Sequence, residues 1–152
     1  MRNATMDDLP AIAAVEAACF PAAEAATAEE FAGRLAHYAD HFWLLFEDGQ
    51  LAAFVDGFCT DTPDLTDAMY ADASLHDENG AWQMIFGVNT LPRCRCQGYA
   101  AAALLCKVRL CERGGFRLYP RRGGVVSDAA AVLLRQRLTV QKSPMIHWGF
   151  EQ

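Results

Sequence analysis

The sequence predicts a single α/β domain, and three observations support this prediction. Apolar residues recur at helical spacing after residue 8, an aromatic hairpin begins at residue 42, and a buried strand over 81–90 leads through a glycine turn into a helix. With 152 residues, 53% of them hydrophobic and 21% charged, the chain has the size and composition of one compact domain. We therefore expect one domain over residues 1–152.

The first third of the chain predicts a strand and two helices. Residues 2–5 favour a short edge strand, and apolar side chains from Leu9 to Val15 form the stripe of a first helix. Thr27-Ala28-Glu29-Glu30 has the S/T-x-x-E form of a capping box, so a second helix should begin there and run to about residue 38.

The middle of the chain predicts a β-hairpin and a central strand. Residues 42–46 and 51–60 read as two strands joined by a tight turn at Asp48-Gly49. Residues 61–80 form a long polar connection in which we expect a short helix near 65–69. Residues 81–90 then read as a buried strand.

The last third predicts helix and strand in alternation. Gly98 marks a turn, and residues 99–113 read as a helix that Gly114-Gly115 ends. We expect a strand over 116–119, a helix over 127–138 and a last strand over 145–150.

Composition limits the environment of the protein. No apolar run approaches the roughly twenty residues that cross a bilayer, and no signal-peptide core follows Met1, so we expect a cytoplasmic protein without membrane attachment. The six cysteines are then expected to be reduced thiols. The spacing of Cys94, Cys96, Cys106 and Cys111 is not that of a usual zinc site, so no metal is expected.

Charge divides the chain into two halves. Residues 1–92 carry two basic and sixteen acidic side chains, a net charge of −14, whereas residues 93–152 carry eleven basic and three acidic ones, a net charge of +8. The basic half would suit a phosphate-rich ligand and the acidic half a cationic amine, or the halves neutralise each other in the fold. Nucleic-acid binding through 121–124 is the least favoured interpretation, because the acidic half opposes it.

The segment that points most directly to chemistry is Arg95-Cys96-Gln97-Gly98-Tyr99-Ala100. It follows a strand and opens a helix, where a glycine lets the backbone approach a ligand and unpaired N–H groups face an anion. This arrangement predicts a pyrophosphate cradle.

This segment resembles the R/Q-x-x-G-x-G/A loop of the GNAT acetyltransferases, which binds the pyrophosphate of coenzyme A. Arg2-x-Ala4-Thr5-x-x-Asp8 resembles the first strand and helix start of that family, and residues 42–58 its central hairpin. The resemblance covers residues 1–105, and the sequence diverges from about residue 106. It implies the acyl-CoA N-acyltransferase fold, a mostly antiparallel twisted sheet flanked by helices (α+β), and acetyl-CoA as the acyl donor.

Within that superfamily, Cys19-Phe20-Pro21, Asp64-Leu65-Thr66 and residues 81–88 are similar to the arylalkylamine (serotonin-type) N-acetyltransferases and their bacterial relatives. The similarity implies direct attack of a small primary amine within a ternary complex. The thioester carbonyl would lie against Phe86, Gly87 and Val88, where the N–H of Val88 would stabilise the oxyanion. The implied aryl pocket comprises Phe20, Phe58, Trp82 and Met84, although each of them taken singly is more commonly a core residue. Glu24, in the loop between the first two helices, would contact the amine substrate or face water.

The sequence does not show the usual catalytic acid and base. The two histidines of arylalkylamine enzymes are replaced by Trp82 and Met84, neither of which accepts a proton. The candidates that remain for moving protons are His76, His147 and, in place of the missing acid, Tyr119. The alternatives are a solvated loop residue for His76 and packing residues for His147 and Tyr119. A weak or inactive acyl-CoA-binding protein is therefore the alternative, and the exposed sheet edges would allow a homodimer.

Overall fold

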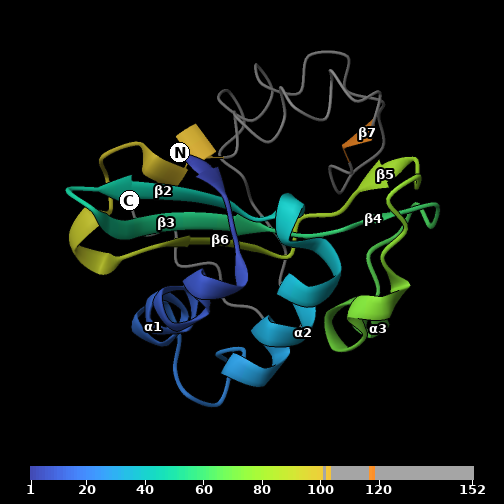
Figure 1. The fold of residues 1–152 in the computed structure, drawn as a ribbon, viewed down its shortest axis with the longest axis horizontal. Coiled ribbons are helices and arrows are strands. Elements are labelled where there is room, and N and C mark those ends of the chain that lie inside the picture. The colour runs from blue at the N-terminus through green and yellow to red at the C-terminus, as the bar shows by residue number, and fades with distance from the viewer. Residues whose placement is uncertain (101, 104–116, 119–152) are drawn as a thin grey trace.

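The computed structural model describes residues 1–100, 102–103 and 117–118, which form two small sheets with helices against them (Figure 1). The first sheet has the order β1-β2-β3-β6 with every neighbouring pair antiparallel. In the second, β4 pairs with β5 antiparallel and β5 pairs with β7 in parallel. The strands are β1 (Arg2–Asn3), β2 (Trp43–Glu47), β3 (Gln50–Asp56), β4 (Cys59–Thr60), β5 (Trp82–Gln83), β6 (Gly87–Thr90) and β7 (Arg117–Leu118).

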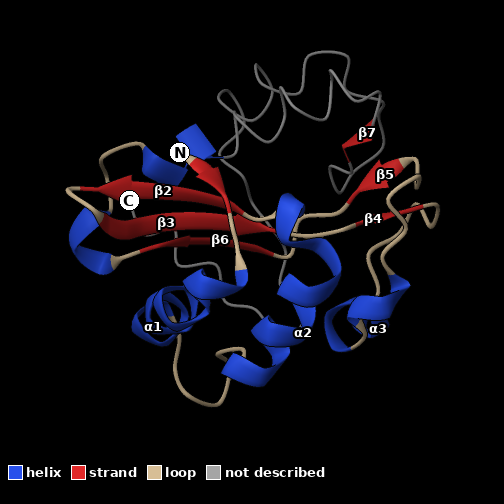
Figure 2. Ribbon diagram, viewed as in Figure 1, coloured by secondary structure: helices blue, strands red, loops and turns tan. Residues whose placement is uncertain are grey.

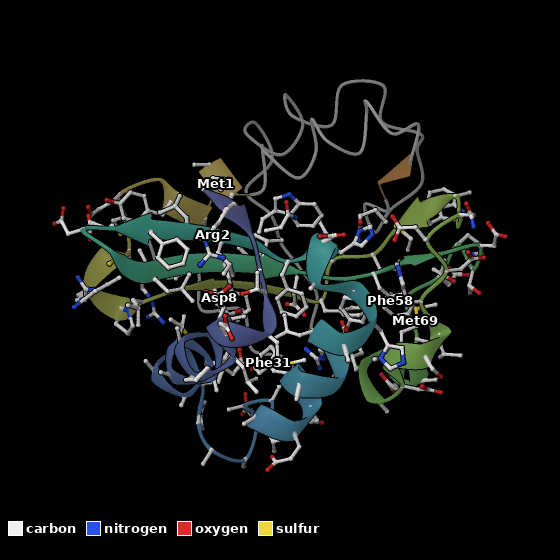
Figure 3. The ribbon with its side chains drawn as sticks, viewed as in Figure 1. Met1, Arg2, Asp8, Phe31, Phe58 and Met69 are labelled. Carbon is white, nitrogen blue, oxygen red and sulfur yellow. The ribbon has the colours of Figure 1, made fainter. Side chains whose placement is uncertain are left out.

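The N-terminal segment forms the predicted strand and helix. Strand β1 pairs with β2, and the 3-10 helix η1 (Met6–Asp8) leads into α1 (Leu9–Cys19). The Asp8 carboxylate accepts two hydrogen bonds of 2.7 Å from the Arg2 guanidinium, and it also accepts the Thr5 backbone N–H at 2.8 Å. Figure 3 shows Arg2 directed at Asp8 across the start of the helix.

The second helix, α2 (Ala28–Tyr38), begins at the predicted capping box. The Glu30 N–H donates to the Thr27 hydroxyl at 3.2 Å, and the Thr27 N–H donates to the Glu30 carboxylate at 2.7 Å. These reciprocal bonds satisfy N–H groups that the first turn leaves free. Helix α2 continues into the 3-10 helix η2 (Ala39–His41).

The hairpin is confirmed, but its second strand is interrupted. Strands β2 and β3 are joined at Asp48 and Gly49, whose φ angles of 48° and 79° are those of a tight hairpin turn. The expected strand over 51–60 breaks between Asp56 and Cys59 into β3 and β4. At Gly57 a Cβ atom would lie 1.9 Å from the Met84 carbonyl oxygen, so only a glycine permits this close approach.

The polar connection contains the expected short helix. It forms α3 (Asp67–Ala71), followed by the 3-10 helix η3 (Ala73–Leu75). After β6, the 3-10 helix η4 (Pro92–Cys94) precedes helical residues at 99, 100, 102 and 103, within the helix predicted over 99–113. Strand β7 lies within the strand predicted over 116–119, whereas the helix over 127–138 and the strand over 145–150 fall outside the described residues.

The core lies between the first sheet and helices α1 and α2, which cover one face of the sheet (Figure 2). Phe31 contacts Phe42 and Phe54 edge to face, with ring centroids 6.2 and 5.9 Å apart. On the other face of the sheet, Val55 packs with Ala103, Ile85 and Val88. In the part of the chain that the structure describes, no helix has the length and apolar character needed to cross a bilayer.

Candidate functional site

The strand expected over 81–90 pairs with the segment that contains β3 and β4, and it contains one residue more than that segment does between the same two pairing points. From Asp56 to Cys59 the chain advances three residues, but from Gln83, which pairs with Cys59, to Gly87, which pairs with Asp56, it advances four. The Phe86 N–H also donates to the Asp56 carbonyl at 2.9 Å, so two residues oppose one. This is a β-bulge, and it explains why the strand divides into β5 and β6.

The bulge changes which side chains face the helices. Before it, Met84 and Phe86 point into the core beneath α1 and α2, while Ile85 lies on the opposite face. After it, Val88 lies on the opposite face and the Asn89 amide reaches Glu16 of α1. Side chains on the helix face are therefore even-numbered before the bulge and odd-numbered after it.

The bulge also determines where backbone N–H groups point. The Leu91 N–H donates to the Ala52 carbonyl at 2.9 Å. Because hydrogen-bonded pairs alternate in an antiparallel ladder, the N–H groups of Asn89 and Gly87 also face β3. The N–H of Val88 consequently points away from β3, toward the side of β6 that has no neighbouring strand among the described residues.

A buried ion pair lies under the bulge. Arg34 of α2 approaches the Asp56 carboxylate at 3.2 Å, and their side chains are only 10% and 1% exposed. The Arg34 guanidinium also donates to the Tyr70 carbonyl at 3.4 Å. Asp56 oxygen Oδ1 occupies the space next to Gly87, where a Cβ atom would lie 2.4 Å from it.

A second buried carboxyl group lies beneath β6. Glu16 accepts hydrogen bonds from the Asn89 amide and, at 3.0 Å, from the Ala26 N–H. Burial raises the pKa of Glu16 above its usual range, and these hydrogen bonds only partly oppose the effect. Glu16 thus joins α1 to β6 through hydrogen bonds rather than through an ion pair.

The segment predicted to be a pyrophosphate cradle is exposed, and its glycine turn leads into a helix as expected. Cys96 and Gly98 adopt φ angles of 63° and 81°, and the Ala102 N–H donates to the Gly98 carbonyl at 2.9 Å in the first helical turn. Residues 95–98 are exposed, while Tyr99 and Ala100 are half-buried. The Arg95 guanidinium lies beside the Cys19 thiol at the end of α1.

The cradle is tied to the β2–β3 hairpin by side-chain contacts. Arg93 approaches the Glu47 carboxylate at 3.7 Å and donates to the Gln50 amide oxygen at 2.6 Å. The Tyr99 hydroxyl also donates to Glu47, and this hydrogen bond both lowers the pKa of Glu47 and raises that of Tyr99. The loop that would hold the phosphates is therefore fixed on the same sheet as the bulge.

A network of hydrogen-bonded side chains surrounds Gln83 of β5. The Gln83 side-chain amide donates to the Met84 carbonyl at 2.8 Å, which directs its oxygen at His41 Nδ1, 2.6 Å away. His41 Nε2 lies 2.9 Å from Glu78 Oε2, and His76 Nε2 lies 3.0 Å from the same oxygen. The Cys59 N–H donates to His76 Nδ1 at 3.2 Å. Both imidazoles are buried, whereas the Glu78 side chain is 66% exposed.

The direction of each hydrogen bond indicates which ring nitrogens of this network carry a proton. His76 accepts at Nδ1, so its neutral form carries a proton on Nε2 and donates to Glu78. His41 donates at Nδ1 to Gln83, and a second proton must lie between His41 and Glu78. Burial alone would raise the pKa of Glu78, but its hydrogen bonds to the two histidines lower it overall.

Three of these groups lie close enough to surround a metal ion. The nearest ligand atoms of His41, His76 and Glu78 are all within 4.8 Å of one another. A metal at His76 Nε2 would require the proton on Nδ1, where the Cys59 N–H already donates. The contacts thus favour a hydrogen-bonded network over metal ligation.

The structure does not assemble the predicted aryl pocket as an open site. Phe58 and Met84 are fully buried in the core, while Phe20 and Glu24 of the α1–α2 loop and Trp82 of β5 are half-buried. The Phe58 side chain is fully buried, and the centroid of its ring lies 4.9 Å from that of the Phe86 ring.

The proposed catalytic residues are only partly described. Both ring nitrogens of His76 are engaged, and burial lowers its pKa. Tyr119 and His147 lie outside the described residues.

Sequence reasoning missed His41 and the Arg34–Asp56 pair. Arg34 is one of only two basic residues among residues 1–92, and Asp56 is a charged residue within an apolar strand. Both anomalies are visible in the sequence and signal a buried pair. Nothing in the sequence around His41 distinguishes it from a surface histidine.

Comparison with solved structures identifies the fold. No protein-family model matches the chain, and no curated protein is similar in sequence. The chain is similar to GphF, a GNAT-like decarboxylase in complex with isobutyryl-CoA, with a TM-score of 0.70 and 25% identity over 77% of this chain and 62% of that one. It is also similar to the loading GNATL domain of CurA from Lyngbya majuscula, with a TM-score of 0.69 and 21% identity over 77% and 61% of the two chains.

A third similar structure is the aminoglycoside N-acetyltransferase AAC(6')-Iy in complex with CoA. Its TM-score is 0.59 at 14% identity, over 99% of this chain and 93% of that one. The chain therefore has a GNAT-like α+β fold, the fold of acyl-CoA-dependent acyltransferases. It spans about three fifths of the length of the GphF and CurA chains.

Proposed function

We propose that the protein transfers the acetyl group of acetyl-CoA to a small primary amine. The observation that carries this proposal is the bulge at Phe86 and Gly87, which turns the Val88 N–H outward on the strand that leads to the exposed loop at 95–98. In this proposal one extended ligand places its thioester carbonyl on that N–H and its pyrophosphate on that loop. The GNAT-like fold and the CoA-bound similar structure support the same substrate.

The proposed chemistry is one acyl transfer within a ternary complex. The amine lone pair attacks the thioester carbon, and the carbonyl oxygen becomes an oxyanion that the Val88 N–H stabilises. The C–S bond then breaks, the thiolate of coenzyme A leaves, and the amine nitrogen loses a proton to water or to a base. The engaged nitrogens of His76 leave it no free lone pair in this arrangement, so we assign it no proton transfer.

The sequence supports an amine acceptor of the arylalkylamine type. The resemblance of residues 19–21 and 81–88 to that branch suggests an aromatic amine, and the acidic first half of the chain would attract a cation. The buried positions of Phe58 and Met84 do not provide an open aryl pocket, so polyamines are tested beside arylalkylamines.

A second candidate function is decarboxylation of an acyl-CoA that carries a carboxylate. The observation that favours it is the similarity to a GNAT-like decarboxylase, at a higher TM-score than to the aminoglycoside enzyme. In this reaction the bond to the carboxylate breaks, carbon dioxide leaves, and the electron pair forms an enolate whose oxygen would occupy the same position on Val88. A proton then adds to the carbon.

Calorimetric titration with acetyl-CoA, followed by assays of thiol and carbon dioxide release, separates these functions. Amine-dependent thiol release supports acetyl transfer, and carbon dioxide release from malonyl-CoA without an amine supports the second candidate. Binding without either product indicates an acyl-CoA-binding protein without turnover. No binding at millimolar ligand would remove the acyl-CoA assignment.

A pair of arginine variants locates the ligand. Arg95→Ala should weaken acetyl-CoA binding by about tenfold, the loss of one charge-assisted hydrogen bond to a phosphate. Arg2→Ala is the matched control, because Arg2 pairs with Asp8 at the other end of the chain. Equal affinities for the two variants would place the phosphates away from residues 95–100.

A further inference from the structure

The Asp56 residue contacts the bulge through both its backbone and its side chain. Its carbonyl accepts the Phe86 N–H at 2.9 Å, and its carboxylate occupies the space that a side chain at Gly87 would need. Asp56 therefore contacts both residues of the bulge, Phe86 through its carbonyl and Gly87 through its carboxylate. A larger residue at position 87 would displace either the strand or Asp56.

Arg34 connects this carboxylate to the surrounding elements. It extends from α2 to the Asp56 carboxylate, and its guanidinium also donates to the Tyr70 carbonyl in α3. The guanidinium carbon lies 5.9 Å from the centroid of the Phe86 ring, over the first residue of the bulge. One side chain thus joins two helices to the bulged strand.

The pair is poorly arranged for stability alone. Burying two charges costs several kcal/mol per ion, and good hydrogen bonds must offset this cost. Among the described residues the Arg34 Nε has no hydrogen-bond partner, although it is buried. A buried cation that leaves one donor unpaired suggests that the pair serves a geometric purpose.

We propose that Arg34 and Asp56 are positioning residues that hold the bulge so that the Val88 N–H meets the developing oxyanion. The inference rests on the proposed acyl-CoA function and adds a supporting structure that lies on the helix side of the sheet. Neither residue touches the substrate. Their effect is to fix the direction of one backbone N–H.

The first test replaces Asp56 by the isosteric amide and uses a matched aspartate as control. Asp56→Asn should lower kcat for thiol release at least about tenfold, part of the effect of losing an oxyanion donor. The Kd of acetyl-CoA should stay within about threefold, because the pyrophosphate cradle is elsewhere in the chain. Asp8→Asn breaks a remote Arg–Asp pair and should change neither quantity.

A second variant keeps the inference testable if Asp56→Asn does not fold. Gly87→Ala introduces a methyl group against Asp56 Oδ1 without leaving a buried charge unpaired, and it should also lower kcat with little change in Kd. The backbone amide resonance of Val88 supplies a readout besides activity. It should shift when acetyl-CoA is added to the wild-type protein and shift much less in Gly87→Ala.

The outcomes separate the two proposals. Wild-type rates in folded Asp56→Asn and Gly87→Ala would overturn the positioning role and leave the enzyme intact. If the wild type binds acetyl-CoA without turnover, the transfer reaction fails, and the Val88 resonance alone decides the positioning role. If the wild type binds no acetyl-CoA, both proposals are overturned.

Discussion

At the scale of single residues, Asp8 shows how much local structure one carboxylate organises. It accepts hydrogen bonds from the Arg2 guanidinium and from the Thr5 N–H and hydroxyl, so it fixes the passage from β1 into α1. The hydrogen bonds to Arg2 are the largest cause that lowers the pKa of Asp8 from 3.8 to about 2. This carboxylate therefore favours the folded state only while it is ionised.

The first prediction concerns the pH dependence of this contact. Because the folded-state pKa is depressed, the stabilisation is complete above the unfolded pKa near 3.8 and is lost as the pH falls through about 2. Asp8→Asn should lower the free energy of unfolding at neutral pH by about 1 kcal/mol, since Arg2 is half exposed and screened. Urea denaturation at several pH values measures both effects. A variant whose loss is as large at pH 2 as at pH 7 would contradict the assignment.

The second prediction concerns Gly57, where neighbouring backbone fills the space of a side chain. In Gly57→Ala the new Cβ would lie within 2.9 Å of three backbone atoms of Met84 and Ile85. Backbone yields less easily than a side chain tip, so the variant should lose at least about 3 kcal/mol of unfolding free energy. Gly33→Ala is the matched control, because it meets no atom within 4 Å and lies in α2. It should be neutral or gain about 0.5–1 kcal/mol.

Single residues could be predicted where their role depends only on neighbours in the sequence. The capping box at Thr27 and the turn at Asp48-Gly49 depend on neighbours in the chain, and both formed as expected. The aryl pocket depends on which face of a strand each side chain occupies. Phe58 and Met84 face the helices and are buried there, which no local pattern specifies.

At the scale of elements, the network around His41 holds the segment after η3 against β4. His41 precedes β2, Gln83 lies on β5, and Glu78 comes from the long connection. The Asp77 N–H donates to the Cys59 carbonyl at 2.9 Å, so this connection also pairs with the edge of β4. The network thus protects a strand edge that would otherwise be free to pair with another chain.

The third prediction removes the centre of this network. His41→Ala should cost about 1–3 kcal/mol, because the buried Gln83 oxygen loses its contact of 2.6 Å with His41 and Glu78 loses one of its two histidine partners. The Asp77 amide should then exchange its hydrogen faster. His37→Ala is the control, since His37 is exposed and its ring contacts the Gly33 carbonyl of its own helix, and its effect should stay within about 0.5 kcal/mol. Unchanged exchange at Asp77 in His41→Ala would show that the segment is held by other contacts.

The sequence predicted a continuous strand over 81–90, and the structure shows why the bulge escaped prediction. Residues 81–88 are largely apolar, so they lack the alternation that would reveal a change of face. The extra residue becomes apparent only when the paired residues of β5 and β6 are compared with those of β3 and β4, which lie about thirty residues earlier. Register between distant strands depends on packing that one sequence does not display.

At the scale of the whole molecule, the charge asymmetry allows two interpretations, which measurements at different salt concentrations can distinguish. Net charges of −14 and +8 on residues 1–92 and 93–152 either stabilise the fold by mutual attraction or act on ligands. The described pairs Arg93–Glu47 and Arg95 beside Cys19 link the basic residues of the cradle to the acidic half.

The fourth prediction is that salt acts mainly on the ligand. Between about 0.01 M and 1 M ionic strength the Debye length falls from about 30 to about 3 Å, and the affinity for acetyl-CoA should fall roughly three- to tenfold. The free energy of unfolding should change by less than about 1 kcal/mol, because exposed pairs contribute little. Calorimetry and urea denaturation at the two salt concentrations measure these quantities. A large loss of stability with unchanged affinity would favour mutual neutralisation of the halves.

The bulge at Phe86 and Gly87 also affects how the sequence can be aligned with other chains. Because the helix-facing positions change from even to odd numbers at this point, a one-residue gap within residues 82–90 preserves the faces of both strands only if it lies between Gln83 and Gly87. A gap placed after Gly87 would equate Val88 with residues that face the helices and Asn89 with residues on the opposite face. Alignments at low identity should therefore be anchored separately on β5 and on β6, so that insertions are confined to the short segment between them.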